Sequence, residues 1–106
     1  EKIPSMDCLV TRNKFSPPIV CDEVMRDWKA RGYDCRPFVD PPGQEWNNFV
    51  HQTNELVTVA EGRLEMTVAS QRLMVDPGDE VFIPKGTVHS VKNSNNGITR
   101  WFFGYD

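Results

Sequence analysis

The sequence predicts an all-β sandwich or barrel, preceded by an N-terminal leader that carries one helix. From Tyr33 onward, short runs of alternating apolar and polar residues are separated by turn residues at close spacing. Within one run, Leu64, Met66 and Val68 fall on the same face of a strand, because side chains alternate with a period of two. Many short strands with Gly, Pro and Asn between them are typical of a sandwich or barrel, and closure removes exposed sheet edges.

Residues 1–32 form the predicted leader, which contains the extended segment SPPIV and ends in a helix packed on the β-rich body. The helical segment CDEVMRDWKARGY has Asp22 as its expected N-cap. Gly32 is the expected C′ residue, since glycine accepts a left-handed backbone without strain. The apolar stripe that faces the body consists of Val24, Met25 and Trp28.

Residues 33–106 form the predicted β-domain, in which turn signals such as PPGQ and NNG separate the strands. In chain order the strand-like runs are YDCRPFV, EWNNFVHQ, ELVTVAEG, RLEMTVAS, QRLMVDPGD, EVFIPKG, TVHSVKNS and ITRWFFGYD. Two segments, ELVTV and VFIP, are apolar on both faces, which indicates that a second layer covers them. That layer is either the leader or a partner subunit, so a homodimer is an expected arrangement.

The composition suits one ordinary globular domain, with 106 residues, of which 39% are hydrophobic and 25% are charged. The net charge of -3 and the lack of a basic cluster argue against a nucleic-acid partner. No apolar run approaches the roughly 20 residues that a membrane-spanning helix needs, so no membrane association is expected. The segment EKIPSMDCLVTRNKF lacks the apolar core of a signal peptide, and the scattered cysteines, Cys8, Cys21 and Cys35, favour reduced thiols. We therefore expect a cytoplasmic protein.

The chain contains only two histidines, His51 and His89, and each lies in a strand-like segment beside turn residues. Glu55 follows His51 across the turn QTN, so the next strand can bring its carboxylate back beside the imidazole. Before His89, Gly78 and Gly86 permit turns with positive φ. These turns are expected to aim His89 into the interior of the β-domain.

The segment GDEVFIPKGTVHSVKN resembles the second conserved motif of the cupin superfamily. Its fixed positions are occupied by Gly78, Pro84, Gly86, His89 and Asn93. Cupins are small barrels, so the resemblance implies a double-stranded β-helix of the jelly-roll type.

The segment from Gly43 to Gly62 resembles the first cupin motif, in which two histidines and a glutamate lie between two glycines. His51 and Glu55 match the second histidine and the glutamate, whereas Phe49 stands where the first histidine is expected. Positions 49 and 51 are expected to share one face of a strand. The resemblance covers about the C-terminal two thirds of the chain and leaves out the leader and the helix.

Two imidazoles and one carboxylate, from His51, His89 and Glu55, resemble the arrangement of two histidines and one carboxylate that favours non-haem Fe(II). The same set could hold Zn, Ni or Mn, because residue types alone do not select the metal. Phe49 cannot ligate, so a metal would keep a further open position for water or substrate, or the site has weakened.

Residues near these motifs are candidates for a substrate pocket, namely Phe49, Gln44, Trp46, Thr53 and Arg100. The other aromatic residues could line a pocket or fill the core, and Tyr105 on the last strand could reach a substrate. Two functions follow for a cupin with this site. One is a metal-dependent enzyme, such as a dioxygenase, isomerase or lyase, acting on a small molecule. The alternative is a metal-free barrel that binds or senses a small molecule without catalysis.

Overall fold

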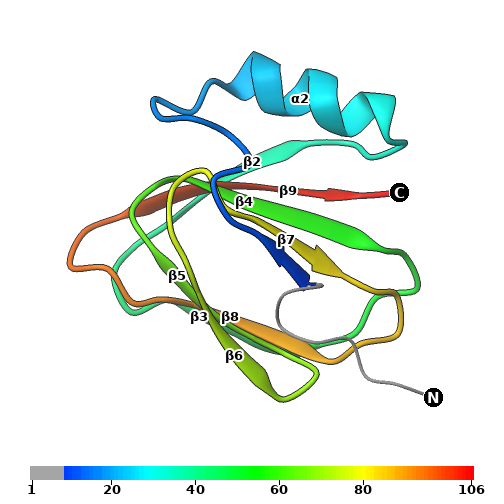
Figure 1. The fold of residues 1–106 in the computed structure, drawn as a ribbon. Helices are drawn as coiled ribbons and strands as arrows, with labels where there is room; N and C mark the ends of the chain where they lie inside the picture. Colours follow the sequence, from blue (N-terminus) through cyan, green and yellow to red (C-terminus); the bar gives the residue numbers. More distant parts are fainter. Residues whose placement is uncertain (1–8) are drawn as a thin grey trace.

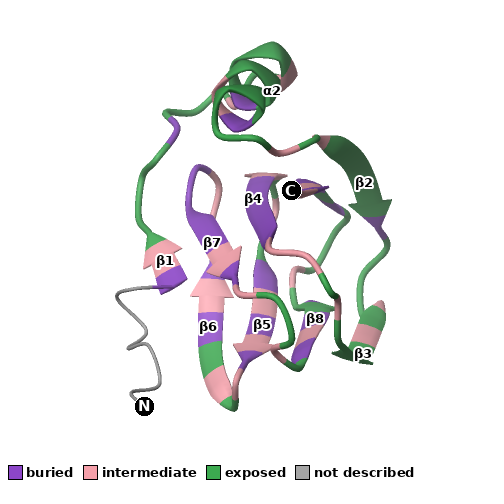
Figure 2. Cartoon of the chain, turned by 90° about the vertical axis from the view of Figure 1, so that its right-hand side faces the viewer, coloured by how far each residue is buried: buried purple, intermediate pink, exposed green. Residues whose placement is uncertain are grey.

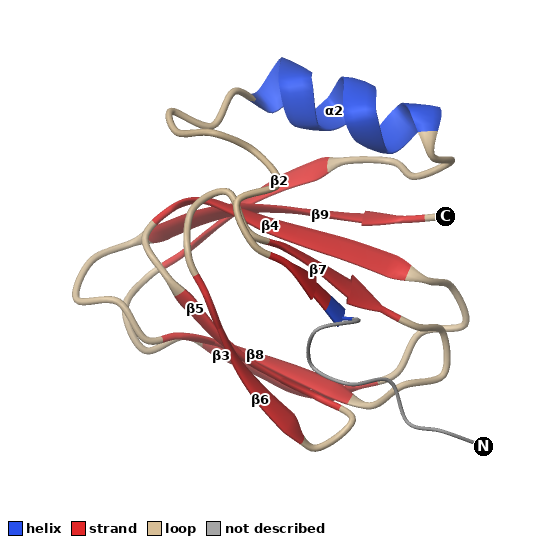
Figure 3. Ribbon diagram, in the orientation of Figure 1, coloured by secondary structure: helices blue, strands red, loops and turns tan. Residues whose placement is uncertain are grey.

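A computed structural model describes residues 9–106, and its strands form two antiparallel sheets that face each other (Figure 1). The first sheet has the order β1 (Val10–Thr11), β7 (Glu80–Ile83), β4 (Glu55–Glu61), β9 (Thr99–Tyr105) and β2 (Arg36–Asp40). The second has the order β3 (Glu45–Phe49), β8 (His89–Asn93), β5 (Leu64–Val68) and β6 (Gln71–Val75). The predicted all-β class is confirmed, and Figure 3 shows the helix α2 (Cys21–Ala30) outside the two sheets.

The main core lies between the sheets and follows the predicted alternation of side chains. Leu64, Met66 and Val68 are fully buried on β5, while the residues between them are only partly buried. Val57 and Val59 of β4 meet them from the opposite sheet. Figure 2 shows the buried residues along the strands and the exposed residues on the outside of β2 and the helix.

A second apolar cluster covers the outer face of the first sheet, and the leader with its helix α2 (Cys21–Ala30) supplies three of its five buried residues. Trp28 is fully buried there, and its indole Nε1 donates a hydrogen bond of 2.8 Å to Glu80 on β7. Leu56 and Phe102, which point outward from β4 and β9, belong to the same cluster. The leader is therefore the layer that covers the strands with two apolar faces, and its strand β1 also pairs with β7.

The structure contradicts the predicted N-terminal end of α2 and confirms the predicted C-terminal end. The prediction of Asp22 as N-cap is wrong, because the helix begins at Cys21 and the extended residue Val20 is the N-cap, without a side-chain hydrogen bond. Asp22 instead lies in the first turn, where a carboxylate still interacts favourably with the helix dipole. The prediction for Gly32 is confirmed, since its φ is 91° just beyond the C-cap.

Two of the three cysteines, Cys21 and Cys35, are free thiols in the cluster beneath the helix. Cys8 lies outside the described residues. Burial raises the pKa of Cys35 to about 11, because a thiolate is poorly solvated there. A thiol that stays protonated near neutral pH is a poor nucleophile, which agrees with a packing role.

Alkylation of Cys35 by iodoacetamide near neutral pH is therefore expected to be roughly 100-fold slower than that of an unperturbed cysteine. The rate is measured by mass spectrometry of the peptide that carries Cys35, with glutathione in the same reaction as reference. A rate similar to that of glutathione would show that the thiol ionises as freely as in water.

Within residues 9–106, no helix has the length and apolar character that crossing a membrane requires.

Candidate metal centre

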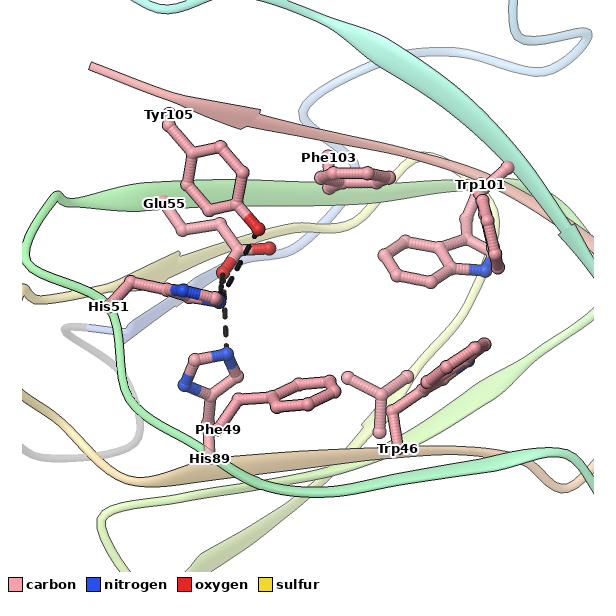
Figure 4. Close-up of a pocket in the computed structure, with 10 residues that line it drawn as sticks. Trp46, Phe49, His51, Glu55, His89, Trp101, Phe103 and Tyr105 are labelled. Carbon is pink, nitrogen blue, oxygen red and sulfur yellow. Dashed lines mark hydrogen bonds and ion pairs between the residues drawn. The ribbon is translucent and has the colours of Figure 1, made fainter.

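His51, Glu55 and His89 meet at one end of the space between the two sheets (Figure 4). Glu55 begins β4 in the first sheet and His89 begins β8 in the second, so the site joins the two layers. His51 lies in the loop between β3 and β4, and its carbonyl accepts a hydrogen bond of 2.8 Å from the amide of Gly86. One nitrogen or oxygen atom from each of the three residues lies within 4.8 Å of the others.

The ring orientation of His89 leaves one nitrogen free to bind an ion. Nδ1 lies 3.1 Å from the carbonyl oxygen of Thr87, and a carbonyl only accepts, so Nδ1 carries the proton in this contact. The other nitrogen, Nε2, faces Glu55 Oε1 at 3.3 Å. In a neutral imidazole Nε2 then presents a lone pair to the centre of the site, as in a histidine prepared for metal binding.

Glu55 has one carboxylate oxygen that is buried and has no hydrogen-bond donor beside it. Its Oε1 atom accepts no hydrogen bond, and Glu55 is only 5% exposed. This oxygen lies 3.6 Å from His51 Nε2 and 3.3 Å from His89 Nε2. A buried carboxylate oxygen that accepts no hydrogen bond is costly, and a cation among these three atoms would remove that cost. The donor set therefore fits a divalent metal ion.

A proton on His89 is the second kind of positive charge, besides a metal ion, that this arrangement favours. Burial lowers the pKa of His89, but the contacts with Glu55 and with the Thr87 carbonyl outweigh it, so the pKa lies above its ordinary value. In the metal-free protein, an imidazolium at His89 can therefore balance the Glu55 carboxylate. A metal ion and this proton compete for the same nitrogen.

Tyr105 adds a hydroxyl group to the site. Its Oη atom lies 3.3 Å from His51 Nε2, and the two rings meet edge to face with centroids 4.9 Å apart. Burial raises the pKa of Tyr105, and the nearby charge of Glu55 raises it further, so the phenol keeps its proton. The alternation along β9 could have placed Tyr105 in the cavity, since it follows Trp101 and Phe103 on one face.

Phe49 lies opposite His89 on the paired strands β3 and β8. Its ring centroid is 6.0 Å from that of His51 and 6.2 Å from that of His89. The expectation that positions 49 and 51 share a strand face needs correction, because β3 ends at Phe49 after a register shift, with Asn48 at a φ of 59°. Both side chains nevertheless line the same cavity.

The cavity has a volume of about 310 Å³ and two chemically different ends. We call the group of His51, Glu55, His89 and Tyr105 the polar end. The remaining lining residues form the aromatic end and are Phe38, Trp46, Phe49, Val91, Trp101 and Phe103. Figure 4 shows Trp46 and Trp101 on the far side of the cavity from His51 and Glu55, with Phe103 between Trp101 and Tyr105.

The predicted pocket residues divide into two groups. Trp46 and Phe49 line the cavity. Gln44 turns its amide toward the carbonyl of Glu45, and Thr53 borders a neighbouring surface depression that shares His51 and Tyr105 with the cavity. Arg100 is exposed and lies 3.4 Å from Glu61. The assignment of Gln44, Thr53 and Arg100 to a substrate pocket stays a prediction.

The cupin domain family model matches residues 38–105, which is more than half of the chain. No curated protein sequence matches. A conserved protein of unknown function from Streptococcus pyogenes has 19% identity and a TM-score of 0.64, covering 69% of this chain and 62% of that one.

Two further similar structures are a cupin domain and an enzyme. The cupin domain of Cnp3 from Schizosaccharomyces pombe has 18% identity and a TM-score of 0.65, covering 69% of this chain and 54% of that one. Salicylate 1,2-dioxygenase from Pseudoaminobacter salicylatoxidans has 16% identity and a TM-score of 0.64, covering 70% of this chain and 20% of that one. The alignments span less than two thirds of each of these structures, and such identities show the fold alone. The fold and the family match together show that the chain belongs to the cupin domain family.

Proposed function

We propose that this cupin holds a divalent metal ion on His51, Glu55 and His89 and binds a small molecule in the adjoining cavity. The observation that carries the proposal is the buried Oε1 atom of Glu55, which accepts no hydrogen bond and faces two imidazole nitrogens. Three protein ligands leave open positions on the ion, as in catalytic rather than structural sites. Fe, Zn, Ni and Mn all suit the donor set.

The residues of this chain would bind and orient the ligand as follows. A bound ion supplies Lewis-acid or redox chemistry. Tyr105, whose phenol stays protonated, can donate a hydrogen bond to an oxygen of the ligand beside His51. The aromatic end excludes water from the apolar part of the ligand, which strengthens electrostatic interactions at the polar end. These features suit an oxygenase, isomerase or lyase whose substrate offers an oxygen atom to the metal.

A metal-free binding or sensing barrel is the second candidate. Phe49 stands where the cupin motif has its first histidine, and a proton on His89 can balance Glu55 without any metal. In that case the histidines would bind a polar group of the ligand directly. Ligand binding would then persist in EDTA.

Metal analysis tests the first candidate directly. The protein is purified without a chelating tag, analysed by mass spectrometry for metals, then stripped and reloaded with Fe(II), Zn, Ni or Mn in turn. We expect one ion per chain after reloading with at least one of these metals. Substoichiometric metal in every case would contradict the proposal and favour the metal-free barrel.

A cytoplasmic location and a homodimer also belong to the proposal. The described cysteines, Cys21 and Cys35, form no disulfide, which agrees with a cytoplasmic location.

A further inference from the structure

The aromatic end of the cavity offers a ligand almost no polar contacts. Of the described residues that line the cavity, none is Lys or Arg, so an anionic group would find no cationic side chain there. The polar side chains of the lining all belong to the polar end, except for the indole groups of Trp46 and Trp101. Whether those indoles donate into the cavity therefore decides which ligands fit.

Asp40 removes both indole donors from the cavity. This carboxylate, at the end of β2, is only 1% exposed. Its oxygens accept the Nε1–H of Trp46 at 3.2 and 3.3 Å and the Nε1–H of Trp101 at 3.0 Å. The indoles thus present their carbon edges and faces to the cavity. A ligand with hydroxyl groups at this end, such as a sugar, would lose hydrogen bonds to water without replacing them.

Two walls of aromatic side chains bound the aromatic end of the cavity. Phe49 and Trp46 stack on the β3 side, with an interplanar angle of 30° and centroids 6.3 Å apart. Trp101 and Phe103 lie on the β9 side with centroids 5.4 Å apart. Phe38 connects the walls, since its centroid is 5.8 Å from that of Trp46 and 5.7 Å from that of Trp101. Phe49 stands where the cupin motif has its first histidine, and its ring extends the wall formed with Trp46 up to the polar end.

We propose that the ligand is a planar aromatic molecule of one or two fused rings with one oxygen substituent. Its rings lie between the two walls and its oxygen points to the polar end. The cavity of about 310 Å³ is roughly twice the size of one known to hold a benzene molecule, which sets this limit on ring number. The position of the oxygen rests on the proposed metal function, whereas the aromatic class rests on the walls and on Asp40 alone.

A quaternary ammonium ion is the other ligand class that aromatic boxes bind. Such a site gains when a carboxylate faces the cation, but Asp40 is engaged by the two indoles and Glu55 belongs to the polar end. The neutral aromatic class is therefore favoured, and choline serves as the competing probe.

Binding of 2-naphthol to the Zn²⁺-loaded protein, measured by calorimetry, tests the proposal. Choline and myo-inositol are titrated in parallel. We expect 2-naphthol to bind and the other two probes to show no binding. Tighter binding of choline or myo-inositol than of 2-naphthol would overturn the aromatic class, as would failure of 2-naphthol to bind.

Variants at Phe49 test whether the rings of 2-naphthol lie between the two aromatic walls. Phe49→Leu should weaken 2-naphthol binding about fivefold through loss of the aromatic wall and leave Zn²⁺ affinity unchanged. Phe49→His should weaken 2-naphthol binding as well, but tighten Zn²⁺ binding about tenfold because it restores a ligand. Phe49 is 39% exposed, so neither change disturbs the core, and circular dichroism checks the fold. Unchanged 2-naphthol affinity in both variants would contradict the placement between the walls.

The same titrations separate the two proposals. Zn²⁺ titration of the metal-free protein without any organic probe tests the metal site alone. If neither Zn²⁺ nor Fe(II), Ni²⁺ or Mn²⁺ binds while 2-naphthol binds to the metal-free protein, the proposed metal function is wrong and the aromatic ligand class stands. If Zn²⁺ binds and 2-naphthol does not, the metal site stands and the ligand class is wrong.

Discussion

Replacing Glu55 by glutamine is expected to lower the affinity for Zn²⁺ by more than about 100-fold, because even residues that only support a metal ligand contribute 10–100-fold. The change removes the one formal negative charge among the three candidate ligands. The same variant is expected to make the metal-free protein more stable at alkaline pH, by about 1–3 kcal/mol. Its amide can donate to the free Nε2 of His89, whereas the carboxylate oxygen at that position accepts no hydrogen bond.

The gain in stability should depend on pH through His89. The folded protein raises the pKa of His89 above its ordinary value of 6.5, so its ion pair with Glu55 contributes stability that is fully present below that value. That contribution is lost as the pH rises through the folded pKa. The stabilising effect of Glu55→Gln is therefore expected to be largest above the folded pKa and to shrink, or reverse, near pH 6.

Zn²⁺ calorimetry and urea unfolding in EDTA, at acidic and alkaline pH, provide the two measurements. Glu61→Gln is the matched control, since Glu61 is an exposed carboxylate on the same strand and pairs with Arg100. It should change neither quantity. Wild-type Zn²⁺ affinity in Glu55→Gln would show that Glu55 is not a ligand, and a loss of stability at alkaline pH would show that its carboxylate is satisfied in the metal-free protein.

Trp28→Ala is expected to lower the free energy of unfolding by about 3–5 kcal/mol, the usual cost of truncating a large aromatic residue in a core. Trp28 is fully buried between α2 and the first sheet, and its indole donates to the buried carboxylate of Glu80. Its removal leaves a cavity and takes away one donor to Glu80. The loss is large because the leader helix covers a sheet face that would otherwise be open to water.

Urea denaturation measures this effect, with Met25→Ala as the control on the same helix. Met25 belongs to the predicted apolar stripe but is 44% exposed, so its truncation should cost less than about 0.5 kcal/mol. Similar small effects in both variants would show that the helix packs only loosely on the sheet in solution.

The period-two pattern made much of the fold predictable. It placed Leu64, Met66 and Val68 in the core, and the glycine and proline positions of the two motifs brought His51, Glu55 and His89 into one family pattern. The structure then placed these three residues around one point. The buried face of β5 and the turns are local features, because they depend on strand alternation and turn geometry within short segments. The meeting of His89 with His51 and Glu55 joins two sheets, and it was expected through the resemblance to the cupin motifs.

Features that depend on pairing between distant strands were not predictable from the sequence. The hydrogen bond from Trp101 to Asp40 requires the register of β2 against β9, in which Phe38 lies opposite Trp101. The early end of β3 requires the register shift before Phe49. The helix begins after Val20, whose side chain makes no capping hydrogen bond, so a rule based on capping side chains could not locate this boundary.

The central claim, that His51, Glu55 and His89 hold a metal ion, is tested most directly by anomalous diffraction from crystals of the protein loaded with Zn²⁺. One strong peak is predicted among the three residues, within about 2.0–2.2 Å of the Nε2 atoms of both histidines and of a carboxylate oxygen of Glu55. A crystal of the loaded protein with no peak at this position, or with its zinc bound elsewhere, would contradict the claim.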